Sequence, residues 1–393
     1  MAKGTVMAPA PAPNSMLKLQ GQVVPAESVD PVAFFAQTRR QTNLEAALSF
    51  NGSQPTLTTE LIKSDILAGI QVRFVGSITI NIGTGGATST FRWPYDLIAN
   101  AQLAANGQTN LLSASGAKFK AREMMKAIEL TDRGVAQTWG AASVTQGTLS
   151  QAAESWGIAP GAVLASGTYN VDLNWYLPVA EDEVDLAGAL FLQTSTNSVV
   201  LTLTPATIAQ LVTLTGDATA SISGTFQISA VRFDIPVANG HIIIPDLRVF
   251  HSFVQNQTQA LSTGGANRIP LPGQGIGKSL LRVFGQTWNG APSAQLAVND
   301  TTYGQIGWIY GAHNTPDVYA SGGVIRHYNE RWYNADIGRL HGFWSIDFAR
   351  ENAFRDVVDL GAVTDLSVLV GYPSGLVLTN PVLEWVAETM FVA

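Results

Sequence analysis

The feature that most constrains the fold is an alternation of residue types over Ile70–Ile82. Every even-numbered position holds an apolar residue or glycine, and the odd-numbered positions are mostly polar. Successive side chains of a β-strand point to opposite faces of a sheet, so this pattern predicts a long strand with one buried face. One-sided alternation is typical of antiparallel sheets, which predicts a mostly antiparallel β chain. Four later segments alternate in the same way, at 170–179, 222–235, 339–348 and 366–372. In the second of them the apolar residues change parity near Ala230, which predicts a β-bulge.

Two segments depart from this pattern and favour helices. Asp30 and Pro31 are a suitable N-cap and first helical residue, and a loose apolar face follows them, which predicts a helix over 30–48. Ser115–Leu130 is the best helical candidate inside the chain. Residues 1–28 contain several prolines and are expected to form a flexible arm.

An internal similarity predicts two related β domains. The segment WYLPVAEDEVDLAGAL begins at Trp175, and WSIDFARENAFRDVVDLGAV begins at Trp344. Each has an aromatic strand, an acidic connection and a V-D-L sequence, and each precedes another apolar strand and a proline. Two sandwiches of roughly 150–200 residues fit eight-stranded jelly rolls better than immunoglobulin domains of about 100 residues. We therefore predict an all-β fold of two tandem eight-stranded jelly rolls with few small helices, divided as 1–50 (N-terminal arm and helix), 51–237 (first roll) and 238–393 (second roll).

The composition narrows the possible functions. Only 13% of the residues are charged, against about 25% in ordinary soluble domains. A surface of neutral polar residues suits a protein that is covered by neighbours, because burying unpaired charge is costly. The net charge of -7 argues against a dedicated nucleic-acid binder, which needs a basic surface. The absence of cysteine excludes disulfides and zinc–thiolate sites. No apolar stretch approaches the ~18 residues of a membrane-spanning helix, and the N-terminus does not read as a signal peptide.

Three sequence features could indicate ligand binding or catalysis, but a purely structural role explains each of them better. The segment Pro272–Ser279, PGQGIGKS, ends like a phosphate-binding loop, but proline stands where the first glycine is required and a β-like sequence follows. The acidic cluster Glu181–Asp185 offers oxygen ligands for calcium, yet it lacks the spaced D-x-D-x-D-G pattern, so a solvated or salt-bridging turn is favoured. The five histidines occur singly, without an H-x-H pair, and no G-x-S-x-G elbow exists. We predict no catalytic residues, no cofactor and no metal site.

The expected N-terminal helix offers the one set of candidate site residues. Aromatic residues beside arginines on a helix can lie against a membrane surface. The alternative is that this helix docks on the first β domain, and the sequence favours neither. The candidate membrane-facing residues are Phe34, Phe35, Arg39 and Arg40.

The segment YNVDLNWYLPVAEDEVDLAGALFLQTSTNSVVLTLTP, residues 169–205, resembles the matching region of tectivirus major capsid proteins. In that family, a strand that ends in W/Y-hydrophobic-P precedes an acidic turn and D-L-x-G-A. Looser similarities occur in three further segments, at HIIIPDLRVFHSF (241–253), SLLRVFGQTWN (279–289) and LSVLVGYPSG (366–375). The specific matches cover about a tenth of the chain, while the order of the segments is compatible over most of it.

The resemblance implies a double-jelly-roll capsomer of a tailless bacteriophage. Three chains would form a homotrimer with a pseudo-hexagonal outline, and the trimers would tile an icosahedral shell over an internal lipid membrane. The N-terminal region would face that membrane, minor capsid proteins are possible partners, and the protein would belong to the virion after assembly in the host cytoplasm. Loops such as 134–165 and 255–278 would make lattice contacts or decorate the outer surface. Two alternatives stay open, namely a trimeric phage spike or receptor-binding protein and a cupin-like or carbohydrate-active enzyme.

Overall fold

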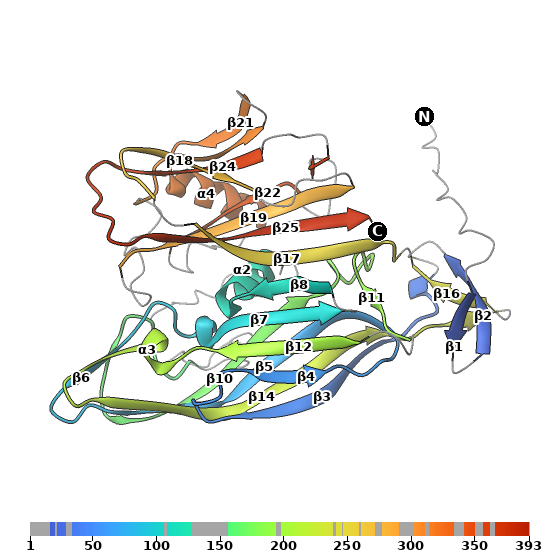
Figure 1. Cartoon of the computed structure of the whole chain (residues 1–393), viewed down its shortest axis with the longest axis horizontal. Helices are drawn as coiled ribbons and strands as arrows, with labels where there is room; N and C mark the ends of the chain where they lie inside the picture. Colours follow the sequence, from blue (N-terminus) through green and yellow to red (C-terminus); the bar gives the residue numbers. More distant parts are fainter. Residues whose placement is uncertain are drawn as a thin grey trace.

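The long strand expected at Ile70–Ile82 is β5 (Ile66–Asn81), which lies inside a sheet of five antiparallel strands. Val72 and Phe74 on its even parity are buried, and Gln71 and Arg73 between them are exposed, so the alternation marks the packed face. The sheet has the order β10-β5-β14-β3, with β11 also paired to β5 (Figure 1). The other strands are β10 (Gly167–Pro178), β14 (Thr219–Phe233), β3 (Arg40–Phe50) and β11 (Leu190–Phe191).

The computed structural model describes most of the chain. Statements about structure refer to residues 16–19, 22–28, 34–105, 108–126, 156–193, 198–238, 241–245, 247–258, 261–271, 277–290, 302–310, 314–333, 342–349, 357–361 and 366–392.

A nine-stranded sheet runs through both halves of the molecule, in the order β22-β19-β25-β17-β8-β7-β12-β4, with β23 paired to β19 (Figure 1). Its halves meet where β17 pairs with β8 in parallel, through Phe253 opposite Leu112 and Val254 opposite Ser113. The bounds are β4 (Leu57–Glu60), β7 (Ile98–Ala105), β8 (Gln108–Ala114), β12 (Val199–Pro205), β17 (Val249–Thr258), β19 (Lys278–Trp288), β22 (Phe343–Asp347), β23 (Val358–Asp359) and β25 (Val382–Val392).

The remaining strands of the described residues form three smaller sheets. One has the order β13-β6-β9, with β6 (Gly86–Ser89), β9 (Val163–Leu164) and β13 (Val212–Thr215). Another has the order β18-β24-β20-β21, with β18 (Gly265–Pro270), β20 (Ile306–Tyr310), β21 (Asn314–Tyr319) and β24 (Leu366–Tyr372). The last pairs the N-terminal strands with the middle of the chain in the order β1-β2-β16-β15, with β1 (Met16–Leu19), β2 (Gln22–Ser28), β15 (Val237–Ala238) and β16 (His241–Ile244).

The buried apolar residues form two main cores, one in each half. The first centres on Val72, Phe74 and Trp175, and the second on Trp344 and Ile346. The described helices are short and lie outside the sheets: η1 (Tyr95–Leu97), α2 (Gly116–Lys126), α3 (Ile208–Leu211) and α4 (Gly322–Tyr333). Two sandwiches with separate cores, joined by one sheet, are the double jelly roll predicted from the alternation and the internal similarity.

The predicted helix over 30–48 is wrong from Arg40 onward. One turn forms at Phe34, whose carbonyl accepts hydrogen bonds from the backbone nitrogens of Gln37 and Thr38, and the chain then enters β3. The reason is tertiary pairing, because β3 gains a ladder of hydrogen bonds with β14 and buries the Glu45–Arg232 ion pair, which outweighs the helix propensity of its Leu, Glu and Ala residues.

Four other expectations can be compared with the structure. The helix expected at Ser115–Leu130 is confirmed over Gly116–Lys126 as α2, and residues 127–130 lie outside the described residues. The bulge near Ala230 is confirmed by register shifts in the pairing of β14 with β3 and β5. The segment 255–278 is not one loop, because it holds the end of β17, all of β18 and the start of β19. Residues 134–155 of the expected loop 134–165 lie outside the described residues, and its last part includes β9.

Candidate functional site: a buried ionic junction

Helix α2 lies at the junction of the two rolls, where it packs on β10 and β7 of the first roll (Figure 1). Phe119 fixes its position by stacking on Phe253 of β17, with 5.0 Å between the ring centroids. Lys118 and Arg122 are one helical turn apart and therefore share a face of the helix. Both side chains are buried, and both contact carboxylates from the second roll.

Strands β19 and β25 present the matching groups. Residues four apart on a strand point to the same face, so Arg282 and Gln286 of β19 lie together, as do Glu384 and Glu388 of β25. The register places Arg282 opposite Glu388 and Gln286 opposite Glu384. Polar groups from two neighbouring strands thus form one buried patch.

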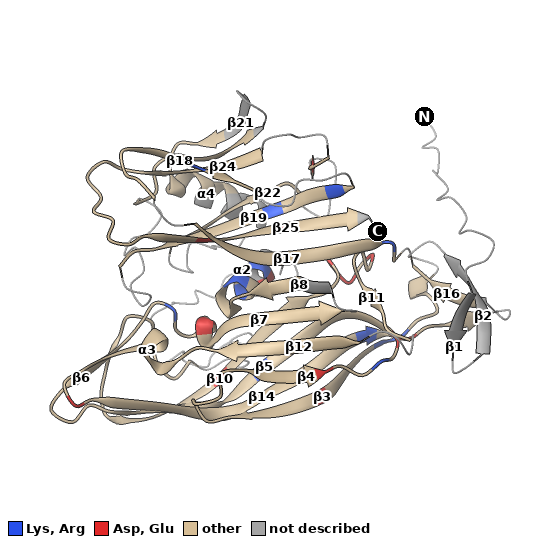
Figure 2. Ribbon diagram, viewed as in Figure 1, with Lys and Arg blue, Asp and Glu red and all other residues tan. Residues whose placement is uncertain are grey.

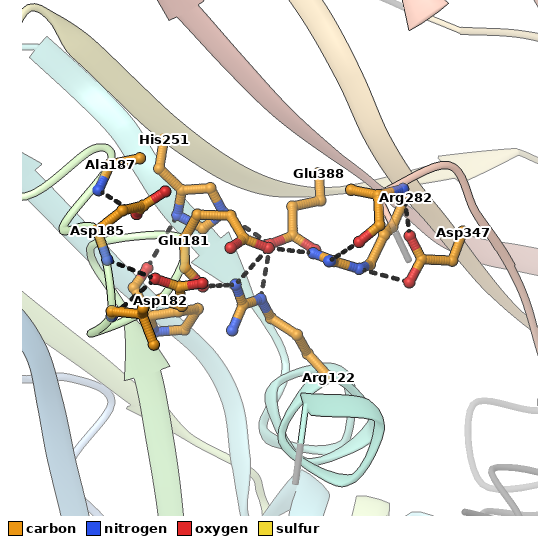
Figure 3. A network of polar contacts seen from close by, with 12 residues as sticks. Arg122, Glu181, Asp182, Asp185, Ala187, His251, Arg282, Asp347 and Glu388 are labelled. Atoms are coloured by element: carbon orange, nitrogen blue, oxygen red, sulfur yellow. Dashed lines mark hydrogen bonds and ion pairs between the residues drawn. The ribbon is translucent and has the colours of Figure 1, made fainter. Parts of the chain in front are cut away.

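Glu388 is the centre of the larger group of charges (Figure 3). Its Oε1 accepts hydrogen bonds from Arg122 Nε at 2.7 Å and His251 Nε2 at 2.8 Å, and its Oε2 lies 3.1 Å from Arg282 Nη1. Arg282 also binds Glu181 at 2.7 Å and Asp347 at 2.8 Å. None of these six side chains is more than 4% exposed. We call this set of Arg122, Glu181, His251, Arg282, Asp347 and Glu388 the Glu388 cluster.

A second group of charges surrounds Glu384. This carboxylate binds Arg92 at 2.8 Å and Lys118 at 3.1 Å, and it accepts a hydrogen bond from the indole of Trp288 at 2.9 Å. Arg92 also pairs with Asp96 at 3.1 Å, and its guanidinium lies 3.9 Å from the centre of the Trp288 ring. Two cations and two carboxylates therefore balance each other in this set of Arg92, Asp96, Lys118 and Glu384, which we call the Glu384 cluster.

The electrostatics follow from burial and pairing. Burial opposes ionisation of Glu388, but the charges of Arg122 and Arg282 and the hydrogen bond from His251 outweigh it and hold the pKa well below its ordinary value. For Glu384, burial is likewise outweighed by Lys118 and Arg92, and the pKa falls to about 2. Both carboxylates are therefore ionised at neutral pH, and the two clusters form a charged seam between the rolls.

The charges of the molecule are concentrated unevenly. Figure 2 shows long stretches of the strands without any charged residue, while basic residues gather on α2 and along β19. The carboxylates of the two clusters form ion pairs with arginine and lysine side chains of the same chain. The described residues contain no group of three or more His, Asp or Glu side chains that could hold a metal ion. This arrangement is suited to holding the two rolls together.

The acidic turn Glu181–Asp185 is salt-bridged, as the favoured interpretation of the sequence predicted. Glu183 pairs with Arg40 and accepts a hydrogen bond from the Tyr176 hydroxyl at 3.0 Å. The Asp182 carboxylate accepts hydrogen bonds from the backbone nitrogens of Val184 and Asp185, and Glu181 reaches into the Glu388 cluster. The turn is thus stabilised by its own hydrogen bonds and is attached to the junction through the Glu181–Arg282 ion pair.

The turn also supports a pH prediction. Burial, helped by the neighbouring Asp182 and Glu181 charges, raises the pKa of Asp185 to about 6 from its ordinary value of 3.8. A carboxyl whose pKa is raised by folding favours the folded state while protonated, so its contribution is complete below about pH 4 and is lost as the pH rises through 6. We expect the melting temperature of Asp185→Asn to exceed that of the wild type by a margin that grows between pH 4 and pH 7. A margin that does not change with pH would contradict this.

The candidate membrane-facing residues separate into two pairs. Phe34 is fully buried, and Phe35 packs edge-on against Phe34 and Phe233, so this segment is docked on the first roll. Arg39 and Arg40 are exposed, and Arg40 pairs with Glu183. Phe34 is therefore covered by the first roll, Phe35 is half-buried, and contact of this segment with a membrane stays a prediction. No helix of the described residues is long and apolar enough to cross a membrane.

The other motifs take structural positions. Lys278 and Ser279 of the PGQGIGKS segment begin strand β19, so a strand and not a helix follows the glycines. Trp175 and Trp344 are buried in the cores. Of the histidines, His251 belongs to the Glu388 cluster and His327 is exposed on α4, while His313 and His341 lie outside the described residues. Sequence reasoning missed the junction, although charged residues inside the apolar strands LLRVF and VLEWVAETMFV were a visible signal.

Comparisons with known proteins address the fold. No protein-family model and no curated protein matches the sequence. The crystal structure of the STIV MCP is similar, with a TM-score of 0.62 and 16% identity over 91% of this chain and 97% of that chain. The fold is that of the double-jelly-roll major capsid proteins. The atomic structure of Sulfolobus Turreted Icosahedral Virus gives a TM-score of 0.64 at 16% identity over 91% of both chains, and the Faustovirus major capsid protein gives 0.51 at 8% identity over the same shares.

These similarities span both rolls and nearly the whole of each chain. They confirm the fold prediction, including the double jelly roll that the resemblance to tectivirus major capsid proteins implies. The buried junction therefore joins two rolls of an architecture that recurs in viral major capsid proteins.

Proposed function

We propose that the chain is a structural major capsid protein whose homotrimers tile an icosahedral viral shell. The observation that carries the proposal is the similarity of both rolls, over 91% of this chain and 97% of the other, to the STIV MCP. The low charge of the chain supports it, because neutral polar surfaces are buried between subunits at little electrostatic cost. The role is mechanical, and no catalytic step is assigned to it.

The proposed assembly follows from symmetry. A closed threefold interface is head-to-tail, so each subunit offers two different faces, and two rolls per chain would give a trimer six roll-shaped units around its axis. The buried junction fixes the angle between the two rolls of one chain, which a regular lattice requires. We propose the virion as the location of the protein, with assembly in the host cytoplasm, minor capsid proteins as further partners and an internal membrane near the N-terminal region.

The division into domains belongs to this proposal. The two main apolar cores support a boundary between the rolls near residue 237, since one is built mainly from the chain before it and the other lies wholly after it. Because β3 (Arg40–Phe50) pairs with β14, we assign it to the first roll and not to the N-terminal arm.

Light scattering on the purified chain, followed by negative-stain imaging, tests the proposal. We expect a stable species of about three times the 41.7 kDa chain mass, with hexagonal top views. A monomer or dimer without a hexagonal outline would contradict the capsomer. An elongated trimer would favour the spike or receptor-binding protein instead.

A further inference from the structure

Two Asn-Gly pairs of the described residues have very different surroundings. The sequence contains four such pairs, of which those at 106–107 and 239–240 lie outside the described residues. Glycine has no Cβ, so its backbone nitrogen is easily approached by the side-chain carbonyl carbon of the preceding asparagine. The pairs at 51–52 and 289–290 can therefore be compared for one reaction, the attack of that nitrogen on the side-chain amide.

Asn51 follows the last residue of β3, and both Asn51 and Ser53 are exposed. The Asn51 Oδ1 accepts hydrogen bonds from the backbone nitrogen of Ser53 at 3.2 Å and from Ser53 Oγ at 2.6 Å. The Asn51 backbone nitrogen donates to Gln54 Oε1 at 2.9 Å, which stabilises the turn. Gly52 has a φ of +82°, and within the described residues its backbone nitrogen donates no hydrogen bond. The attacking nitrogen is therefore free, and the side-chain carbonyl is already polarised.

Asn289 has the same neighbour and a protected geometry. Its Nδ2 donates to the carbonyl oxygen of Val377 at 3.1 Å, and its Oδ1 accepts a hydrogen bond from the backbone nitrogen of Thr379 at 2.6 Å. The Gly290 nitrogen donates to the carbonyl oxygen of Thr379 at 2.6 Å. Attack on this side chain would require Gly290 to give up its hydrogen bond and the amide to leave both of its partners.

We propose that Asn51 is a self-modification site, which reacts with Gly52 to form a cyclic imide that water opens to aspartate or isoaspartate. The Gly52 nitrogen forms a bond to Asn51 Cγ, and the bond from Cγ to Nδ2 breaks. The amide nitrogen leaves as ammonia, together with the proton that Gly52 gives up. Water then adds to one of the two imide carbonyls. Addition at Cγ gives aspartate, and addition at the backbone carbonyl gives isoaspartate.

Ser53 assists the attack on Asn51. Negative charge develops on Oδ1 as the nitrogen adds to Cγ, and hydrogen-bond donors that already point at such an oxygen stabilise the charge. Ser53 provides two of these donors, its backbone N–H and its hydroxyl. The turn after β3 therefore combines a free nucleophile with a small binding site for the developing oxyanion.

The modification lies directly after Phe50, whose ring packs against Phe74 and Phe226 in the core of the first roll. Either product adds a negative charge at this strand end, and isoaspartate also lengthens the backbone by one methylene group. The reaction therefore changes both the charge and the backbone of the turn that leads from β3 to β4.

Peptide mapping by mass spectrometry tests the proposal on the full chain, kept folded at mildly alkaline pH in ¹⁸O-labelled water. We expect the Asn51 peptide to convert into two isomeric products that carry the heavy oxygen, while the Asn289 peptide of the same sample stays unchanged. In urea that unfolds the chain, the two pairs should react at similar rates.

Three results would overturn the proposal. The first is an equal rate at Asn51 and Asn289 in the folded chain. The second is no conversion of Asn51 in the folded chain over the time in which both pairs react in urea. The third is aspartate as the sole product, because direct hydrolysis of the amide gives no isoaspartate. All three are read from the wild-type protein, and none depends on the proposed capsid function.

Ser53→Ala tests the assisting hydroxyl, because it keeps the backbone donor and removes Oγ. We expect the loss of Asn51 to slow about fivefold, the effect of one solvent-exposed hydrogen bond. Ser53→Thr is the matched control, since it keeps a hydroxyl and should react at close to the wild-type rate. A wild-type rate in Ser53→Ala would overturn the role given to Ser53.

Discussion

Replacing Glu388 with glutamine should lower the free energy of unfolding by about 3–5 kcal/mol, the range found when one partner of a buried ion pair is removed. The carboxylate receives hydrogen bonds from Arg122, His251 and Arg282, and none of these side chains is more than 4% exposed. Glutamine keeps the size of the side chain but leaves Arg122 and Arg282 without their common counter-charge. Urea unfolding of the two proteins at neutral pH measures the difference.

The matched control is an exposed ion pair of the first roll. Arg73 and Asp172 form a two-point contact on the open face of the five-stranded sheet, with side-chain exposures of 49% and 28%. Asp172→Asn should cost about 0–1 kcal/mol, because solvent screens such pairs. Equal losses from Asp172→Asn and Glu388→Gln would show that the junction contributes no more than a surface contact.

Acid provides a further readout of the same prediction. The pKa of Glu388 is lowered by folding, so its contribution to stability is complete above the ordinary carboxyl value of 4.5 and is lost as the pH falls toward the lowered value. Glutamine has no such proton equilibrium. The stability difference between the wild type and Glu388→Gln should therefore be constant near neutrality and shrink in acid.

Replacing Gly285 with valine should destabilise the second roll by about 3 kcal/mol or more, at the upper end of the cost of overpacking a core. Gly285 of β19 lies opposite Trp344 of β22, and the indole ring covers its backbone. A Cβ at Gly285 would lie 2.1 Å from Trp344 Cζ2, and the tryptophan is itself 1% exposed, so it has no room to retreat. The melting temperature and the near-ultraviolet circular dichroism of the buried indole would both report the change.

Two controls isolate the steric cause. Gly265 of β18 lies in the same roll, is exposed and has no atom within 4 Å of an added Cβ, so Gly265→Ala should be neutral or stabilising by about 0.4–1 kcal/mol. Trp344→Leu should make Gly285→Ala less costly than it is in the wild type, since residues in contact show non-additive effects. If the losses of stability from Trp344→Leu and Gly285→Ala were strictly additive, a clash with the Trp344 ring would not be the cause of the destabilisation.

The β architecture was predictable because its signal is local. The alternation over Ile70–Ile82 identified β5, and the apolar parity of 170–179 correctly placed Trp175 and Leu177 in the core. Strand β3 was mistaken for a helix because its residues favour a helix in isolation. Its pairing with β14 decides the outcome, and the two strands are too far apart in sequence for a local pattern to show it.

The junction could not be derived from the sequence for the same reason. Arg122 and Glu388 are 266 positions apart, and Lys118 and Glu384 are equally distant. A charged residue in an apolar strand indicates that a partner exists, but the identity of the partner depends on how the two rolls dock. His251 was noted as one of five scattered histidines, and its role emerges only once β17, β25 and the acidic turn are placed together.

The parallel pairing of β8 with β17 also bears on how the chain avoids aggregation. An unpaired strand edge is a template for other chains, and repeated edge-to-edge addition leads to fibrils. If the two rolls were separate proteins, the nine-stranded sheet would be divided between β8 and β17, and each of these strands would become an unpaired edge. Because both rolls belong to one chain, β8 and β17 can pair with each other during folding. Neither edge is then left open to other copies of the chain when these accumulate to high concentration.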